Sequence, residues 1–253
     1  MFGAMSEPPA LATDMAVFLD FDGTLVEIAP SPEMVRPEPC LVPLLIRRLD
    51  DLNGALGIVS GRPLAEIDRL LDPLRFPGAG LHGLEYRTSS DAAIERIDIG
   101  SEITVLRGRL AASGLTGAGL QIEDKGSALA VHYRRVPELG MALREHMEAA
   151  IDDLPDLHLI DGKMVVEAKP RLSDKGKMVE AFMRFPPFAG RVPVFIGDDT
   201  TDEDGMRAAA ALGGFGIKVG SGASVGTYRL QDVAAVHRWL AAGVCPETQK
   251  GKR

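Results

Sequence analysis

Cysteine is scarce in this sequence. Cys40 and Cys245 are the only cysteines in 253 residues, and they lie far apart in the chain. A disulfide framework needs several cysteines, and the usual zinc motifs need clustered cysteines and histidines, so neither feature is implied. Such low cysteine usage fits a reducing compartment, and we expect a cytoplasmic protein.

Long apolar runs and an excess of positive charge are also missing. No stretch reaches the roughly 18 apolar residues of a membrane helix, and residues 1–14 lack a signal-peptide pattern, so no membrane partner is expected. The formal net charge is -8, from 28 basic and 36 acidic residues. Because binding to a phosphate backbone needs a basic surface, nucleic acid is not expected as a partner.

Phosphate-loop and dinucleotide-binding glycine motifs are absent too, which argues against nucleotide binding of these types.

What the chain does contain is a short apolar run that ends in two carboxylates. Residues 16–19 have the pattern of a buried strand, and Asp20, Asp22 and the turn at Gly23-Thr24 follow at once. Ligands of open α/β sheets bind just beyond the carboxyl ends of such strands. Two neighbouring carboxylates repel each other unless a proton or a cation lies between them. The pair is therefore either an acidic turn or part of a Mg²⁺ site.

The order of the expected elements predicts an α/β core. Apolar runs at 16–19, 55–59, 78–81, 191–196 and 215–219 are expected strands, and helices are expected near 38–52, 63–71, 175–185, 206–212 and 233–240. Strands that alternate with helices are typical of a parallel sheet with helices on its faces.

The middle of the chain follows another pattern. Helices are expected at 102–113 and 137–154, and hairpins at 120–135 and 157–168. Two hairpins and two helices predict a small open sheet with helices on one face. We therefore expect a core made of residues 1–101 and 169–253, with a separate α+β unit inserted at 102–168.

Polar residues follow several of the expected core strands. The carboxyl ends of parallel strands meet at one edge of a sheet, so these side chains could converge. Mg²⁺ takes one or two carboxylates together with substrate phosphate, and a hydroxyl, a lysine and backbone amides at a helix start can bind phosphate oxygens. The residues that this argument brings together are Asp20, Asp22, Ser60, Gly61, His82, Lys175 and Asp198.

Four motifs in this order resemble those of haloacid-dehalogenase-like (HAD) phosphatases. They are Asp20-Phe21-Asp22-Gly23-Thr24-Leu25, Val59-Ser60-Gly61-Arg62, Lys175 ahead of a helix, and Gly197-Asp198-Asp199 followed by Thr201-Asp202. The resemblance implies a Rossmann-like parallel-sheet core with the inserted unit as its α+β cap domain. It also implies a Mg²⁺-dependent phosphatase that acts through an aspartyl-phosphate.

The resemblance also implies a role for each motif residue. Asp20 would be the nucleophile and a Mg²⁺ ligand, and Asp22 would be the general acid and base, meeting Mg²⁺ through its backbone carbonyl. The other roles are phosphate binding by Ser60, Gly61 and Lys175, Mg²⁺ binding by Asp198, and support by Asp199 and Asp202.

A finer resemblance, over roughly residues 16–239, is to trehalose-6-phosphate phosphatases, which act in trehalose biosynthesis. It rests on four stretches: Ser60-Gly61-Arg62, Leu81-His82-Gly83-Leu84-Glu85, Glu123-Asp124-Lys125-Gly126 followed by Val131-His132-Tyr133-Arg134, and Glu167-Ala168-Lys169-Pro170. The family usually has arginine where this chain has Lys169, and lysine lacks the bidentate contact of arginine. The implied substrate-binding residues are Arg62, His82, Glu123, Lys125, Glu167 and Lys169.

Several alternatives stay open at this point. A sugar phosphatase of the sucrose-phosphate or mannosyl-phosphoglycerate type, or a phosphosugar mutase, would carry the same core motifs. A catalytically inactive regulatory or binding module usually lacks one of the two aspartates, and both Asp20 and Asp22 are present. His82 could contact substrate or organise its loop, and His132 is expected to be a structural strand residue. Because no long N-terminal extension precedes the motifs, we expect a stand-alone phosphatase, monomeric, with a small-molecule sugar phosphate as partner.

Overall fold

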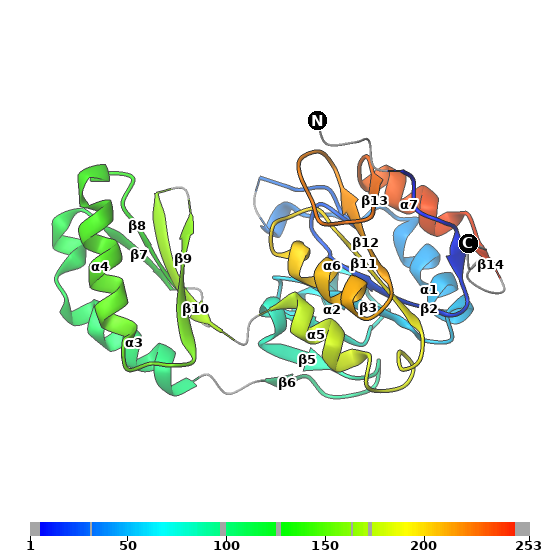
Figure 1. Cartoon of the computed structure of the whole chain (residues 1–253), viewed down its shortest axis with the longest axis horizontal. Coiled ribbons are helices and arrows are strands. Elements are labelled where there is room, and N and C mark those ends of the chain that lie inside the picture. The colour runs from blue at the N-terminus through cyan, green and yellow to red at the C-terminus, as the bar shows by residue number, and fades with distance from the viewer. Residues whose placement is uncertain are drawn as a thin grey trace. The chain divides into compact units, whose positions relative to one another are not determined.

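The structure is a computed structural model that describes residues 6–30, 32–96, 100–124, 128–162, 164–171 and 174–245. The chain forms two compact units, one made of Met1–Glu95 with Asp174–Arg253 and the other of Arg96–Ser173. The second unit is drawn in green in Figure 1. It contains the range 102–168 that was expected as the insertion, and it extends a few residues beyond that range at both ends.

A mostly parallel sheet forms the centre of the larger unit (Figure 1). Neighbouring strands from β13 to β4 run parallel, and β5 runs antiparallel to β4. This topology confirms the expected α/β class. In spatial order the strands are β13 (Tyr228–Leu230), β12 (Phe215–Val219), β11 (Val192–Gly197), β2 (Met15–Leu19), β3 (Leu56–Val59), β4 (Gly78–Gly80), β5 (Glu85–Arg87) and β6 (Glu95–Arg96).

Helices in two pairs pack on this sheet. Figure 1 shows α5 beside α6 and α1 beside α7, and each pair is in contact. A further two-stranded parallel sheet joins β1 (Leu11–Ala12) to β14 (Val244–Cys245). The helices of this unit are α1 (Leu41–Asp51), α2 (Leu64–Leu70), α5 (Lys175–Phe182), α6 (Asp202–Ala211) and α7 (Val233–Ala241), with short 3₁₀ turns at Pro32–Met34 and Leu81–Gly83.

The central strands are buried on both faces, which explains their continuous apolar sequence. All residues of β2 are buried, and the Phe18 ring stacks on Phe188 with centroids 5.0 Å apart. Phe18 also lies 6.1 Å from the Phe182 ring of α5. Because burying one such aromatic side chain contributes roughly 1.5–3 kcal/mol, this cluster anchors the strand that leads into Asp20.

The smaller unit is an antiparallel sheet covered by two helices. Strand β8 pairs with both β7 and β10, so the two predicted hairpins join into one sheet of order β7-β8-β10-β9. Its apolar core joins the helices to one face of the sheet. The elements are α3 (Gly100–Ala112), β7 (Gln121–Asp124), β8 (Leu129–His132), α4 (Gly140–Ile151), β9 (Leu157–Gly162) and β10 (Val165–Pro170), with 3₁₀ turns at Leu115–Ala118 and Pro137–Leu139.

In the described part of the chain, no helix is both long enough and apolar enough to cross a membrane.

Candidate active site

The carboxyl ends of the central strands surround a cavity of about 680 Å³. Asp20 follows β2, Ser60 follows β3, and Asp198 follows β11, so three neighbouring strands each deliver a polar side chain to the same edge. The cavity thus brings together most of the predicted site residues of the larger unit. Those that line it are Asp20, Asp22, Ser60, Gly61, Arg62, His82, Lys175, Asp198 and Asp199.

Lys175 joins two of the carboxylates at the base of this cavity. Its Nζ lies 2.8 Å from Oδ1 of Asp20 and 2.5 Å from Oδ1 of Asp202. The three side chains are almost fully buried. The Asp174 carboxylate caps α5 by accepting a hydrogen bond from the Gly176 amide at 2.6 Å, so the helix start fixes the position of the lysine.

Burial changes the protonation behaviour of these groups. Burial raises the pKa of Asp20 to about 7, although the Lys175 ammonium acts in the opposite direction. Burial alone would lower the pKa of Lys175, but its ion pairs with Asp20 and Asp202 raise it above the ordinary lysine value. The pKa of Asp198 rises to about 6 because of burial and the nearby charges of Asp202 and Asp199. An uncompensated negative charge therefore gathers at this end of the sheet.

A metal ion fits the cluster of Asp20, Asp198 and Asp202. One carboxylate oxygen from each of the three lies within 4.8 Å of the others. A hard cation such as Mg²⁺ binds oxygen ligands and would offset the charge that raises the pKa of Asp20 and Asp198. Gly23 leaves room for this cluster, since a Cβ at that position would lie 2.2 Å from Oδ2 of Asp198. Sequence reasoning gave Asp202 a supporting role, and its carboxylate lies within this cluster while it also contacts Lys175.

The Asp22 side chain is paired with an arginine and is not part of that cluster. Its Oδ2 accepts a hydrogen bond from Nε of Arg62 at 2.6 Å, and its Oδ1 accepts one from Nη2 at 2.8 Å. Glu66 forms a further ion pair with Arg62 through Nη1. The carboxylate of Asp22 is therefore held in a fixed orientation on the cavity wall.

Two turns shape the wall around Ser60 and His82. The Ser60 Oγ accepts a hydrogen bond from the Arg62 amide at 3.2 Å, so its own proton is available to donate. The His82 amide donates to the Ser60 carbonyl at 3.0 Å. A Cβ on Gly61 would lie 2.8 Å from the His82 ring, so a larger residue at this position would displace the ring. His82 therefore organises the loop that carries Ser60, and it also lines the cavity.

Asp202 and Lys218 hold the loop that carries Asp198. The Asp198 and Asp199 amides both donate to Oδ2 of Asp202 at 2.9 Å. The Lys218 ammonium donates to the Asp198 carbonyl. Sequence reasoning missed Lys218 and Glu66, because a lysine within an apolar strand and a glutamate on a helix carry no motif of their own.

The expected cap residues lie in the smaller unit. Glu123 pairs with Ala130 in the register, and Ala130 pairs with Glu167, so the two glutamates project from one face of the sheet. Lys169, two residues after Glu167, lies on the same face, opposite the face that packs on the helices. Lys125 lies outside the described residues.

His132 is bound to one of these glutamates. Its Nε2 lies 2.8 Å from Oε2 of Glu123, and both residues lie on the polar face of the sheet. The contact gives His132 a defined partner across the β7–β8 hairpin, and it orients the Glu123 carboxylate.

Comparison with known proteins reports one family over most of the chain. A family model described as Trehalose-phosphatase matches residues 18–234. The Trehalose-6-phosphate phosphatase of Escherichia coli is 41% identical over 239 residues, which is 93% of this chain and 89% of that protein. A solved structure of the trehalose-6-phosphate phosphatase of Aspergillus fumigatus, 26% identical, superposes with a TM-score of 0.74 and covers 91% of this chain and 92% of that one.

A more distant structure has the same fold. It is a phosphatase of the haloalkanoate (HAD) enzyme superfamily from Bacteroides thetaiotaomicron, 14% identical, with a TM-score of 0.63 over 95% of this chain and 97% of that one. At this identity the likeness concerns the fold alone.

Proposed function

This chain belongs to the trehalose-phosphatase family, and from that premise we propose that it hydrolyses trehalose 6-phosphate to trehalose and phosphate. The observation that carries the proposal is the buried contact between Asp20 and Lys175 at the base of a cavity that also contains Ser60, Asp22 and Asp198. The cavity volume of about 680 Å³ lies in the usual range for small-molecule sites.

Asp20 acts as the nucleophile in this proposal. Its carboxylate oxygen attacks phosphorus and forms an aspartyl-phosphate while the bond from phosphorus to the sugar oxygen breaks, which splits one difficult step into two. Lys175, fixed at the start of α5, orients this carboxylate and offsets charge on the phosphoryl oxygens. The Ser60 hydroxyl and the Gly61 amide line the same cavity and donate hydrogen bonds to phosphate.

Asp22 transfers the protons. In the first step its carboxyl group donates a proton to the departing sugar oxygen, and in the second its carboxylate accepts a proton from the attacking water. The water oxygen displaces Asp20 from phosphorus and releases phosphate. Arg62 holds both oxygens of this carboxylate and so keeps it in one orientation.

Asp20 and Asp198 are the side chains that would hold the metal ion, and Asp202 lies beside them in the same carboxylate cluster. When bound, Mg²⁺ supplies positive charge next to the transferred phosphoryl group and lowers the repulsion that opposes attack by a carboxylate. Asp202 also holds the Asp198 and Asp199 amides, so it keeps the metal-binding loop in place.

In this proposal the smaller unit selects the disaccharide. Its polar face presents Glu123, Glu167 and Lys169, groups that can hydrogen-bond sugar hydroxyls. A site built this way rejects a ligand that lacks the matching hydroxyls, because its own polar groups would be left without partners. Lys169 supplies a positive charge, but it cannot make the bidentate hydrogen bonds that an arginine would make.

Phosphate release from a panel of sugar phosphates tests the proposal. We expect trehalose 6-phosphate to be hydrolysed with a kcat/KM at least about 100-fold above that for glucose 6-phosphate, sucrose 6-phosphate and mannosyl-phosphoglycerate. Equal rates on trehalose 6-phosphate and glucose 6-phosphate would contradict the proposed substrate. Higher activity on one of the other two would assign the chain to that substrate.

A further inference from the structure

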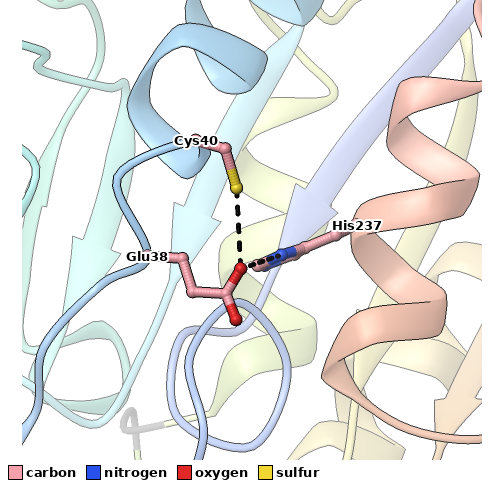
Figure 2. Close-up of side chains that lie close together, drawn as sticks. All are labelled: Glu38, Cys40 and His237. Atoms are coloured by element: carbon pink, nitrogen blue, oxygen red, sulfur yellow. Dashed lines mark hydrogen bonds and ion pairs between the residues drawn. The ribbon is translucent and has the colours of Figure 1, made fainter.

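A second group of side chains of the types that can bind a metal lies at Glu38, Cys40 and His237 (Figure 2). Glu38 and Cys40 come just before α1, and His237 lies on α7, the helix in contact with α1. One potential ligand atom from each lies within 4.8 Å of the other two. These three residues are not among those that line the candidate active-site cavity.

The distances in this group are close to those of a tetrahedral zinc site. Zinc–ligand bonds of about 2.0 Å to oxygen or nitrogen and about 2.3 Å to sulfur place neighbouring ligand atoms about 3.3–3.6 Å apart. The Cys40 Sγ lies 3.5 Å from Oε2 of Glu38. The Nδ1 of His237 lies 3.9 Å from the same oxygen. All three ligand atoms lie within 4.8 Å of one another, so side-chain rotation would have to shorten the longer distances on metal binding.

The orientation of the His237 ring is the second, independent observation. Its Nε2 lies 2.8 Å from the Leu25 carbonyl oxygen, which can only accept a hydrogen bond, so Nε2 carries a proton. The other ring nitrogen, Nδ1, thereby faces the side where the Glu38 carboxylate lies. A histidine that binds metal through one nitrogen commonly donates from the other to a backbone carbonyl.

We propose that Glu38, Cys40 and His237 form a binding site for Zn²⁺, with water as the fourth ligand. Sulfur, nitrogen and oxygen together suit zinc, whereas Mg²⁺ prefers oxygen alone. His237 is 12% exposed and Glu38 is 68% exposed, so one side of the site is closed and the other is open to water. On binding, the Cys40 thiol loses its proton to solvent and the sulfur bonds to the metal as thiolate.

The site joins three segments of the larger unit. Glu38 and Cys40 belong to the loop before α1, His237 belongs to α7, and the Leu25 carbonyl belongs to the loop that begins at Asp20. No motif in the sequence indicates this site, because Cys40 and His237 are far apart in the chain.

Cobalt substitution tests this site directly, because thiolate bound to Co²⁺ gives a near-ultraviolet charge-transfer band that oxygen ligands do not give. The full chain is titrated with Co²⁺ at saturating Mg²⁺, which occupies the all-carboxylate cluster. We expect one equivalent of Co²⁺ to produce the band, and Zn²⁺ to remove it. The band should be lost in Cys40→Ser and retained in Cys245→Ser, the matched control at the only other cysteine.

Two further variants separate metal binding from folding. Glu38→Gln removes a charged ligand from an exposed position, and His237→Gln keeps a donor for the Leu25 carbonyl while removing the imidazole ligand. Each should weaken Zn²⁺ binding at least about tenfold with an unchanged circular dichroism spectrum. A missing band in the wild-type protein, or a band that persists in Cys40→Ser, would overturn the proposal.

Discussion

Both carboxylate oxygens of Asp22 accept hydrogen bonds from one guanidinium group, that of Arg62, at 2.6 and 2.8 Å. Glu66 holds another nitrogen of the same guanidinium, so the arginine is fixed from two sides. The Asp22 side chain, proposed to carry protons, therefore has a defined orientation. Replacing Asp22 should remove proton transfer, whereas replacing Arg62 should change only the orientation of Asp22.

Replacing Asp22 by asparagine should remove the proton transfer and leave the nucleophile intact. General acid–base catalysis contributes about 10²–10⁴-fold, so we expect Asp22→Asn to lower kcat for trehalose 6-phosphate by that factor. Aryl phosphates such as p-nitrophenyl phosphate have a leaving group that needs no proton, so formation of the aspartyl-phosphate from them should be little affected. A pre-steady-state burst of nitrophenol measures this step. Equal impairment of the burst and of sugar phosphate turnover would contradict the role of Asp22.

Replacing Arg62 should disturb the orientation of Asp22. Misplacement of a catalytic group by about 1 Å can cost about 10²-fold in rate, so we expect Arg62→Met to lower kcat by about this amount. Arg69→Met, on the exposed surface of α2, is the matched control and should leave kcat within about twofold of wild type. If Arg62→Met changed KM alone, the arginine would bind substrate without orienting Asp22.

The sequence predicted the elements that have a strong pattern, and it missed those that depend on tertiary pairing. The expected strand at 215–219 matches β12, and residue 175 begins α5 as expected. The short strands β5, β6 and β13 carry too few residues for a recognisable pattern, and their neighbours in the sheet determine them. The helix expected from 38 begins only at Leu41, because Pro39 and Cys40 form a turn before it.

The third core strand also ended earlier than predicted. It was expected to reach Leu81, but β4 ends at Gly80, because Leu81 and His82 have φ angles of 51° and 57° and form a 3₁₀ turn. For the site, motif order predicted the convergence of the strand ends. It could not predict that Asp202 pairs with Lys175 or that Arg62 binds Asp22, since these contacts depend on side-chain directions at strand ends.

Removing the Lys175 ammonium should destabilise the protein. The change leaves the buried carboxylates of Asp20 and Asp202 without their shared cation, and breaking a buried ion pair in this way costs about 3–5 kcal/mol. Urea unfolding of Lys175→Met should show this loss, together with loss of phosphatase activity. Lys177→Met, two residues away on the exposed face of α5, should change the free energy of unfolding by less than about 0.5 kcal/mol.

Gly23→Ala should have two effects. It should strain the backbone, and it should also weaken Mg²⁺ binding. Gly23 has a φ of 73°, and a methyl group there would collide with the Asp198 carboxylate. Gly190 has a φ of 78° with no neighbouring atom within 4 Å, so Gly190→Ala isolates the cost of the backbone conformation, about 1–2 kcal/mol. Calorimetric titration should find reduced Mg²⁺ affinity in Gly23→Ala only. Equal Mg²⁺ affinity in the two variants would show that Asp198 does not bind the ion.

The stability of the metal-free protein should fall as the pH rises through the range in which its buried carboxyl groups ionise. The pKa of Asp20 rises from 3.8 to about 7, and that of Asp198 rises from 3.8 to about 6. Between these values the folded chain retains protons that the unfolded chain has lost, so the free energy of unfolding decreases with increasing pH. Mg²⁺ competes with these protons for the same oxygens, so its affinity should increase over the same range.

Urea unfolding at about pH 5 and about pH 8, with EDTA or with Mg²⁺, measures both effects. We expect EDTA-treated protein to be less stable at the higher pH, and added Mg²⁺ to stabilise it more there than at the lower pH. Asp20→Asn removes the group with the larger shift, so the pH-dependent loss in EDTA should shrink in this variant, which should keep its fold and lose turnover. An unchanged pH dependence in Asp20→Asn would show that the carboxyl group of Asp20 does not bind its proton more tightly in the folded chain.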